Sequence, residues 1–304
     1  MTILLYIIIF FLFLIIISTL LLFKVAFIPG KKVFLNNIDN SKELEKAWEF
    51  SYGKEEELKI KSHDQLTLVG RLIKHKKENK ELAIVIHGYM GEAFDMARYA
   101  KLFYDKGLDV LLPDNRAHGE SEGDYISFGW SDRLDYLLWV ELMIELYGED
   151  INIVLFGVSM GAATAMMLSG EDLPKQVRCI IEDCGYDSVE NQLSYQLKRM
   201  FKLPKYPLIP VASWYTKHKI GFKFSEADCV RQLKKNQLPT LFIHGDKDRF
   251  VPFDMVYNVY EATQGDKELV VFEGSRHATS LSDAPKKYDK AISVFLDKYF
   301  VMKD

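Results

Sequence analysis

The chain of 304 residues is poor in cysteine and carries no excess of positive charge. Its three cysteines, Cys179, Cys184 and Cys229, are too few and wrongly spaced for a disulfide framework or a zinc site, so we expect buried free thiols. The formal net charge of -4 argues against nucleic acid as a partner. The sequence also lacks a Gly-rich phosphate loop and a His and carboxylate cluster at metal-ligand spacing, so no cofactor and no metal are expected.

One long apolar run lies near the N-terminus. Residues 3–23 are apolar except for Tyr6, Ser18 and Thr19. A helix of this length rises about 1.5 Å per residue and reaches roughly 30 Å, the thickness of the hydrocarbon core of a bilayer. A cleaved signal peptide has a basic leading region, a shorter apolar stretch and a small-residue cleavage site, and none of these is clear here. We therefore predict a retained transmembrane anchor with its juxtamembrane segment over residues 1–30, while cleavage stays an open alternative.

The side of the membrane is less well determined. No Lys or Arg precedes the apolar run, whereas Lys24, Lys31 and Lys32 follow it. The positive-inside rule favours a cytoplasmic domain, but an anchor without leading charges is also compatible with export. The prediction is thus a cell membrane crossed once, with the side of the catalytic domain left open.

The remaining residues, 31–304, have an ordinary globular composition and a length near the upper limit of a single core, so we expect one catalytic domain. Short apolar runs here alternate with longer segments of helical period. The expected strands are residues 58–62, 66–74, 82–86, 109–112, 151–156, 177–182, 240–244 and 268–272. The expected helices are residues 93–106, 132–147, 160–168, 253–263 and 284–300. This alternation predicts an α/β fold whose mostly parallel central sheet is covered by helices on both faces.

A serine lies between two glycines where an expected strand meets an expected helix. Residues 157–161 read Gly-Val-Ser-Met-Gly, after strand 151–156 and at the start of helix 160–168. This is the nucleophile-elbow pattern, in which the glycines permit a strained turn that raises the serine hydroxyl above the sheet. The helix directs its free amides toward an oxyanion that forms beside Ser159. Ser159 is therefore the expected nucleophile.

Separated motifs that follow one another in the expected order resemble those of the α/β-hydrolase family. Residues 87–89, His-Gly-Tyr, resemble the segment that donates one oxyanion-hole amide, and the histidine side chain there is expected to be structural. Residues 114–123 resemble the loop after the fourth strand, with Ala117 where the family usually has glycine. The resemblance implies an α/β-hydrolase fold with an inserted helical cap. It also implies an oxyanion hole formed by the backbone amides of Tyr89 and Met160.

The acid and the base are expected after two later strands. Residues 244–252 resemble the family pattern of His-Gly, two variable residues, Asp, two variable residues and Val-Pro, so the resemblance makes Asp248 the acid of a catalytic triad. Asp246 and Asp183 remain alternatives. His277, past the last expected strand, lies where the family carries its catalytic base. The chain order Ser, Asp, His is the one expected for this fold.

These residue types suit nucleophilic catalysis. A serine hydroxyl is a poor nucleophile at neutral pH, so a base of pKa about 6.5 must take its proton during attack and return it to the leaving group. A buried carboxylate holds the imidazole in one tautomer and stabilises its cation. Two preorganised amides hold the developing oxyanion, and each is worth about 3 kcal/mol.

Residues 189–236 interrupt the alternation at the position where the family inserts its cap. They hold ten basic residues against three acidic ones, with seven aromatic residues interleaved. Basic and aromatic side chains together suit a membrane interface, so one interpretation is a cap that rests on anionic lipid headgroups. The other is a solvated cap whose aromatic residues form a small core of their own.

The predicted function is that of a membrane-anchored serine hydrolase that cleaves a carboxylic ester through an acyl-serine intermediate. Its expected substrate is a small-molecule or lipid-like acyl compound, and no nucleic acid is expected as partner. Serine peptidase activity is an alternative, because similar family members remove N-terminal residues from peptides and the elbow does not distinguish an ester from an amide. A second alternative is a binding protein that keeps the fold without turnover.

Overall fold

The computed structural model describes residues 2–30, 46–75 and 80–300, and its centre is a sheet of eight strands. The strands are β1 (Glu55–Lys61), β2 (Thr67–Ile73), β3 (Glu81–Ile86), β4 (Asp109–Pro113), β5 (Asn152–Val158), β6 (Val177–Asp183), β7 (Thr240–Gly245) and β8 (Lys267–Phe272). Their order in the sheet is β1-β2-β4-β3-β5-β6-β7-β8. The first two strands pair antiparallel, and the six from β4 to β8 run parallel. The expected mostly parallel sheet is confirmed.

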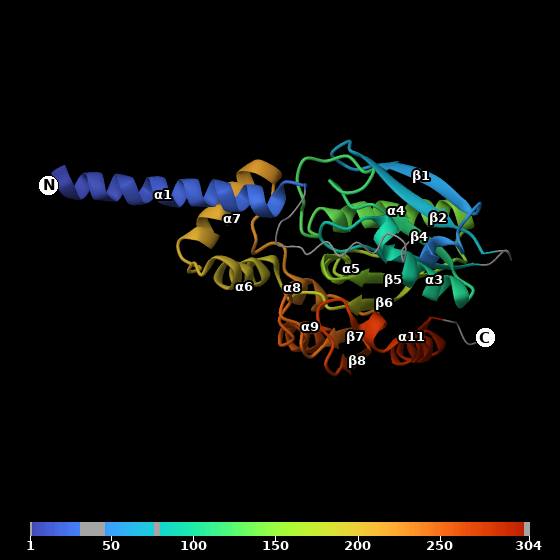
Figure 1. Ribbon diagram of the computed structural model, residues 1–304. Coiled ribbons are helices and arrows are strands. Elements are labelled where there is room, and N and C mark those ends of the chain that lie inside the picture. The colour runs from blue at the N-terminus through green and yellow to red at the C-terminus, as the bar shows by residue number, and fades with distance from the viewer. Residues whose placement is uncertain (1, 31–45, 76–79, 301–304) are drawn as a thin grey trace.

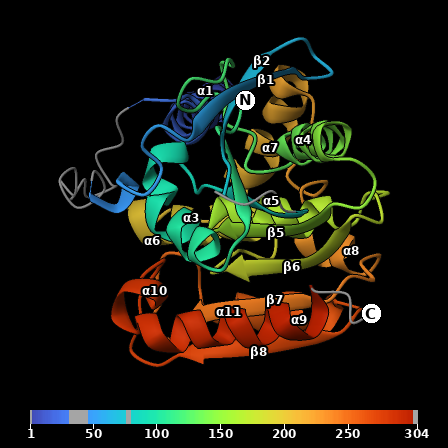
Figure 2. The ribbon, with the colours of Figure 1, turned by 90° about the vertical axis from the view of Figure 1, so that its right-hand side faces the viewer.

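Helices cover both faces of this sheet (Figures 1 and 2). They are α3 (Ala97–Asp105), α4 (Asp132–Tyr147), α5 (Met160–Leu168), α8 (Cys229–Leu233), α9 (Met255–Ala262), α10 (Ser280–Asp283) and α11 (Pro285–Tyr299). Side chains of alternate residues in β3 pack on opposite faces of the sheet. Ala83 lies in one apolar cluster with Phe103 of α3 and Phe295 of α11. Leu82 lies in another apolar cluster with Trp139 of α4. Because both faces are buried at the centre of the sheet, β3, β4 and β5 are nearly continuous apolar runs.

One expected helix is divided. The segment predicted as a single helix over residues 93–106 begins with a 3-10 turn, η1 (Ala93–Met96), before α3. Two carboxylates hold this turn: Asp114 Oδ1 accepts a hydrogen bond from the amide of Ala93 at 2.7 Å, and Asp95 Oδ2 accepts one from the amide of Glu92 at 3.1 Å. These side-chain bonds set the backbone of the first turn, which hydrophobic periodicity does not report.

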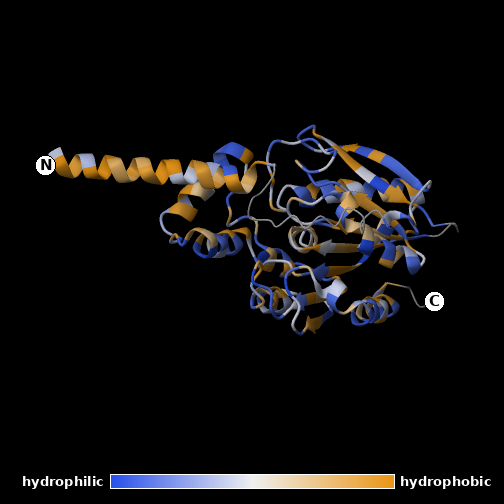
Figure 3. Cartoon of the chain, viewed as in Figure 1, coloured by the Kyte–Doolittle hydropathy of each residue, from blue (hydrophilic) through white to orange (hydrophobic). Residues whose placement is uncertain are grey.

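The N-terminal helix, α1 (Thr2–Phe27), extends away from the domain and is apolar on all sides (Figure 3). Residues 2–14 are exposed, whereas Thr19, Phe23 and Phe27 are buried against the domain. By length and composition α1 is able to cross a membrane, and a signal sequence has the same two properties. The expected start of the catalytic domain at residue 31 lies outside the described residues.

Three helices occupy the interval between β6 and β7 where the cap is expected. These are α6 (Val189–Phe201), α7 (Leu208–Ile220) and the short α8. α7 packs against α1, while α8 packs against α5 and α9 beside the sheet. Figure 1 places α6 and α7 at the end of the domain from which α1 projects.

Candidate active site

Ser159 lies in a strained turn between β5 and α5. Its φ of 57° and ψ of -115° belong to a region that residues other than glycine rarely adopt. The flanking glycines are required by close approach: a Cβ on Gly157 would lie 2.2 Å from the carbonyl oxygen of Gly161, and a Cβ on Gly161 would lie 2.1 Å from that of Ile86. The Ser159 amide donates to the carbonyl of Asp183 at 2.8 Å, which fixes the turn above the sheet.

A chain of two hydrogen bonds runs from this serine to a buried carboxylate. The Ser159 hydroxyl donates to His277 Nε2 at 2.9 Å, and His277 Nδ1 donates to Asp248 Oδ2 at 2.7 Å. Residues 159 and 277 are 118 positions apart in the sequence. The structure thus brings together the three side chains that the sequence proposes as nucleophile, acid and base.

The two alternative acids lie elsewhere. Asp246 Oδ1 accepts from the amide of Gly274 at 2.7 Å. Asp183 Oδ2 accepts from the hydroxyl of Tyr288 at 2.8 Å, and burial raises the pKa of Asp183 to about 6 against the opposing effect of that bond. Neither carboxylate is hydrogen-bonded to His277, so geometry favours Asp248.

Asp248 is held as an ion by its surroundings. Its Oδ1 accepts from the amides of Phe250 and Val251 at 2.8 and 2.9 Å. His244 Nε2 lies 3.3 Å from Asp248 Oδ2, in addition to the bond from His277. Burial alone raises the pKa of Asp248, but the hydrogen bonds from His244 and His277 outweigh it and lower the pKa to about 2. His244 was noted in the sequence only as part of a pattern, and its contact with the acid was missed.

The segment after β3 lies directly beside the serine. A Cβ on Gly88 would be in van der Waals contact with Ser159 Cβ, at 3.5 Å, so the backbone here passes close to the nucleophile. His87 holds the segment, since its Nδ1 donates to the carbonyl of Gly88 at 2.8 Å and its Nε2 accepts from the amide of Asn115 at 2.9 Å. Burial, with the nearby His118, lowers the pKa of His87 to about 3, so this side chain is neutral. Tyr89 therefore follows a fixed turn beside Ser159.

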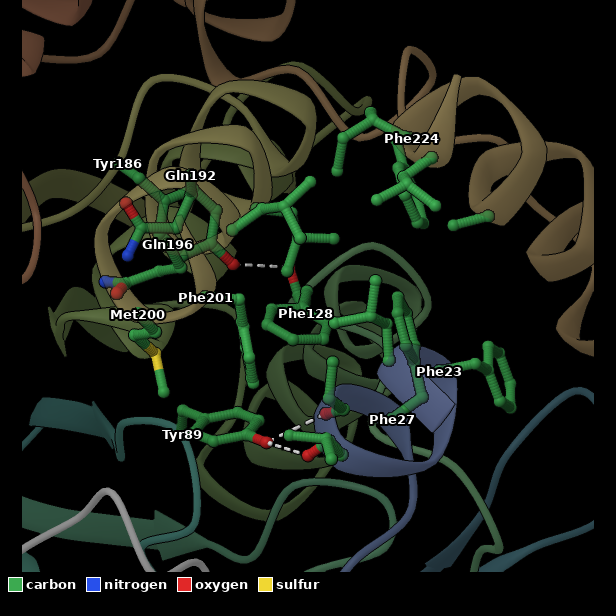
Figure 4. A pocket seen from close by; sticks show the side chains of 18 of the residues that line it. Phe23, Phe27, Tyr89, Phe128, Tyr186, Gln192, Gln196, Met200, Phe201 and Phe224 are labelled. Carbon is green, nitrogen blue, oxygen red and sulfur yellow. Dashed lines mark hydrogen bonds between the residues drawn. The ribbon is translucent and has the colours of Figure 1, made fainter. Parts of the chain in front are cut away.

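An apolar pocket begins at the serine. Ser159, Met160 and Tyr89 line it together with side chains of α1, α6 and α7. Figure 4 shows Tyr89 with Phe27 of α1 and Phe201 of α6 around this pocket. α6 is tied to the loop that carries the acid, because Gln192 Nε2 and Gln196 Nε2 both donate to the carbonyl of Phe250, at 3.0 and 2.7 Å. The helix that walls the pocket is thereby coupled to the position of the acid.

The contribution of α1 to this pocket was not foreseen. Leu22, Phe23, Val25, Ala26 and Phe27 line it, although sequence reasoning treated the apolar run only as an anchor. The one sequence feature that indicates this contribution is that apolar residues continue at helical spacing beyond Lys24.

The described residues contain one group that resembles a metal site, formed by Cys184, Asp248 and His277, with ligand atoms within 4.8 Å of one another. Burial raises the pKa of the Cys184 thiol well above its usual value, which disfavours the thiolate that a metal requires. The Asp248 and His277 atoms are already bonded to each other. All three cysteines are buried and free, as expected.

Comparison with known proteins identifies the family of this chain. A model of the alpha/beta hydrolase family matches residues 83–291. The protein YqkD of Bacillus subtilis is 32% identical over 214 residues, which are 70% of this chain and 70% of YqkD. The esterase Pf2001 of Pyrococcus furiosus has a similar fold, with a TM-score of 0.68 at 22% identity over 90% of this chain and 99% of the esterase. An acylaminoacyl peptidase of Pyrococcus horikoshii has a TM-score of 0.61 at 19% identity, over 82% of this chain and 42% of the peptidase. The chain belongs to the alpha/beta hydrolase family.

Proposed function

We propose that this protein is a membrane-anchored serine hydrolase that cleaves carboxylic esters through an acyl-Ser159 intermediate. The supporting observation is the pair of hydrogen bonds, at 2.9 and 2.7 Å, that connects Ser159 through His277 to Asp248 at one end of an apolar pocket. Asp248 is ionised over the physiological pH range because its pKa is about 2.

Each group has a defined task in this scheme. His277 takes the hydroxyl proton as Ser159 attacks the ester carbonyl, and it gives that proton to the departing alcohol. Asp248 stabilises the imidazolium that forms in between. The amides of Tyr89 and Met160 hold the oxyanion, and the amide of Met160 has no partner within α5 because it belongs to the first turn. Water activated by His277 then releases the acid and restores Ser159.

The pocket favours an ester with an apolar acyl group over a peptide with a free N-terminus. None of the pocket-lining side chains in the part of the chain that the structure describes is charged. An aminopeptidase needs a carboxylate to bind the substrate ammonium group, since an unpaired charge in an apolar site is costly. The peptidase alternative therefore ranks second.

Labelling by a fluorophosphonate probe tests the proposal. The probe is expected to modify the full-length protein, and Ser159→Ala is expected to abolish the signal. Ser169→Ala is the matched control, because Ser169 is a buried serine next to α5 whose hydroxyl bonds only the carbonyl of Met166 in the described structure. Labelling that persists in Ser159→Ala would exclude Ser159 as the nucleophile. p-Nitrophenyl esters assayed beside aminoacyl anilides then rank ester against amide.

The proposal also includes a retained α1 and a cap that lies near the membrane surface. Part of the positive charge of the cap is neutralised internally, since Lys205 pairs with Glu190 at 2.7 Å and Lys217 with Glu226 at 3.3 Å. Lys198 and other exposed basic side chains of the cap are available to anionic headgroups.

A further inference from the structure

The last turns of α1 form one wall of the pocket that contains Ser159. Phe23 and Phe27 are only 4% and 2% exposed and belong to the same apolar cluster as Met160 of the nucleophile turn. Figure 4 shows both rings on one side of the pocket, opposite the side chains of α6. The end of the apolar helix is therefore a component of the candidate active site as well as a tether.

Specific bonds hold this end of α1 in place. The Tyr89 hydroxyl donates to the carbonyl of Ala26 at 2.8 Å, and the amide of Ile126 donates to that of Phe27, also at 2.8 Å. The last carbonyls of a helix have no partner within it, so these bonds satisfy groups that would otherwise be unpaired. The Phe27 ring contacts that of Phe128, with centroids 4.9 Å apart. Tyr89 thus connects α1 to the proposed oxyanion hole.

The exposure of the lining residues locates the mouth of the pocket. Among the lining residues that the structure describes, only Val25 of α1 and Phe201 of α6 are exposed, at 38% and 43%. The pocket therefore opens between α1 and the end of α6. α6 and the last turns of α1, to which these residues belong, lie at the end of the domain from which α1 projects (Figure 1).

The same end of the domain has the composition of a membrane interface. Lys24 directly follows the apolar run of α1 and precedes the rim residue Val25. Tyr206, between α6 and α7, and Trp214, on α7, are 70% and 60% exposed. Lysine at the end of a span and exposed Tyr and Trp are typical of the headgroup level of a bilayer. A mouth beside Lys24 lies close to that level.

We infer that the pocket mouth faces the bilayer in which α1 is embedded and that the enzyme takes single-chain acyl esters directly from the membrane. This inference rests on the proposed function. The acyl chain passes between Val25 and Phe201 into the apolar pocket, while the alcohol part stays at the headgroup level. Attack by Ser159 breaks the ester bond, the alcohol leaves with the proton from His277, and water then releases the fatty acid.

A bulky substitution at the rim tests this route. The full-length protein is reconstituted in phosphatidylcholine vesicles and assayed with p-nitrophenyl decanoate, which partitions into the bilayer, and with water-soluble p-nitrophenyl acetate. Val25→Trp is expected to lower the ratio of decanoate turnover to acetate turnover at least tenfold. Leu20→Trp is the control, because Leu20 is similarly exposed, at 43%, and does not line the pocket. Phe201→Trp, on the opposite rim, is expected to reproduce the selective loss.

Other outcomes have distinct meanings. Decanoate turnover that is equal in wild type, Val25→Trp and Phe201→Trp overturns the inference. A parallel loss on both esters also overturns it, because a membrane route requires the loss to be larger for the ester that partitions into the bilayer. If the wild-type protein neither reacts with fluorophosphonate nor hydrolyses acetate, the proposed function itself fails. That result is distinguishable because it does not depend on the rim variants.

Discussion

Asp248 has hydrogen-bond partners that differ from those of the nearby Asp246. Asp248 is buried and accepts hydrogen bonds from two backbone amides and His277, whereas Asp246, two positions earlier, bonds the amide of Gly274. We expect Asp248→Asn to lower kcat by roughly 10³ to 10⁴ for a soluble ester, because the imidazole loses the anion that stabilises its cation. Asp246→Asn is the matched control and should stay within twofold of wild type. Similar losses in the two variants would show that the acid is misassigned.

The low pKa of Asp248 also makes a prediction for stability. Its pKa is about 2 in the folded protein and 3.8 in the reference state, so ionised Asp248 stabilises the fold above pH 4, and this contribution is lost as the pH falls toward 2. The difference in unfolding free energy between wild type and Asp248→Asn should shrink by about 1 kcal/mol as the pH falls from 5 to 3. Urea unfolding of both proteins in the same detergent measures this difference. A difference that grows on acidification would contradict the shift.

The helix α1 consists of two parts with different environments. Residues 2–14 are exposed, whereas Phe23 and Phe27 are buried in the domain. Deletion of residues 2–14 should change the free energy of unfolding in detergent by less than about 0.5 kcal/mol, as for other changes away from packed contacts. Deletion of residues 2–30 should lower it by several kcal/mol, at roughly 2 kcal/mol for each buried phenylalanine. Equal thermal stability of the two truncated proteins would mean that α1 does not pack against the domain.

The packing of α1 has a consequence for the complete molecule. Cleavage after residue 27 would remove one wall of the pocket and would expose the apolar side chains that Phe23 and Phe27 cover, Met160 among them. We therefore expect the mature protein to keep its N-terminus and to stay in the membrane fraction after washing at high salt and alkaline pH. Intact-mass analysis of protein purified from membranes checks this. A mature N-terminus beyond residue 27 on active protein would refute it.

The strands and the three reactive positions were predictable because their signals are local in the chain. A parallel strand is a short apolar run, and the residue after it lies at the edge of the sheet where chemistry is placed. Ser159 and His277 each follow such a strand, so sequence order and pattern were sufficient to nominate them. The divided helix at η1 was not predictable, since two side-chain hydrogen bonds decide it.

The amino-acid sequence alone determined the class of fold, the apolar helix and the nomination of Ser159, because each depends on residue types within a few positions of one another. Asp248 and His277 were nominated by the resemblance of their segments to the α/β-hydrolase family. Only the tertiary structure decided that Asp248 rather than Asp246 or Asp183 bonds His277, and that α1 walls the pocket. Tyr89 bonds a carbonyl 63 positions away, and Ser159 bonds an imidazole 118 positions away. Contacts across such separations are set by the packing of the whole domain, which no local pattern encodes.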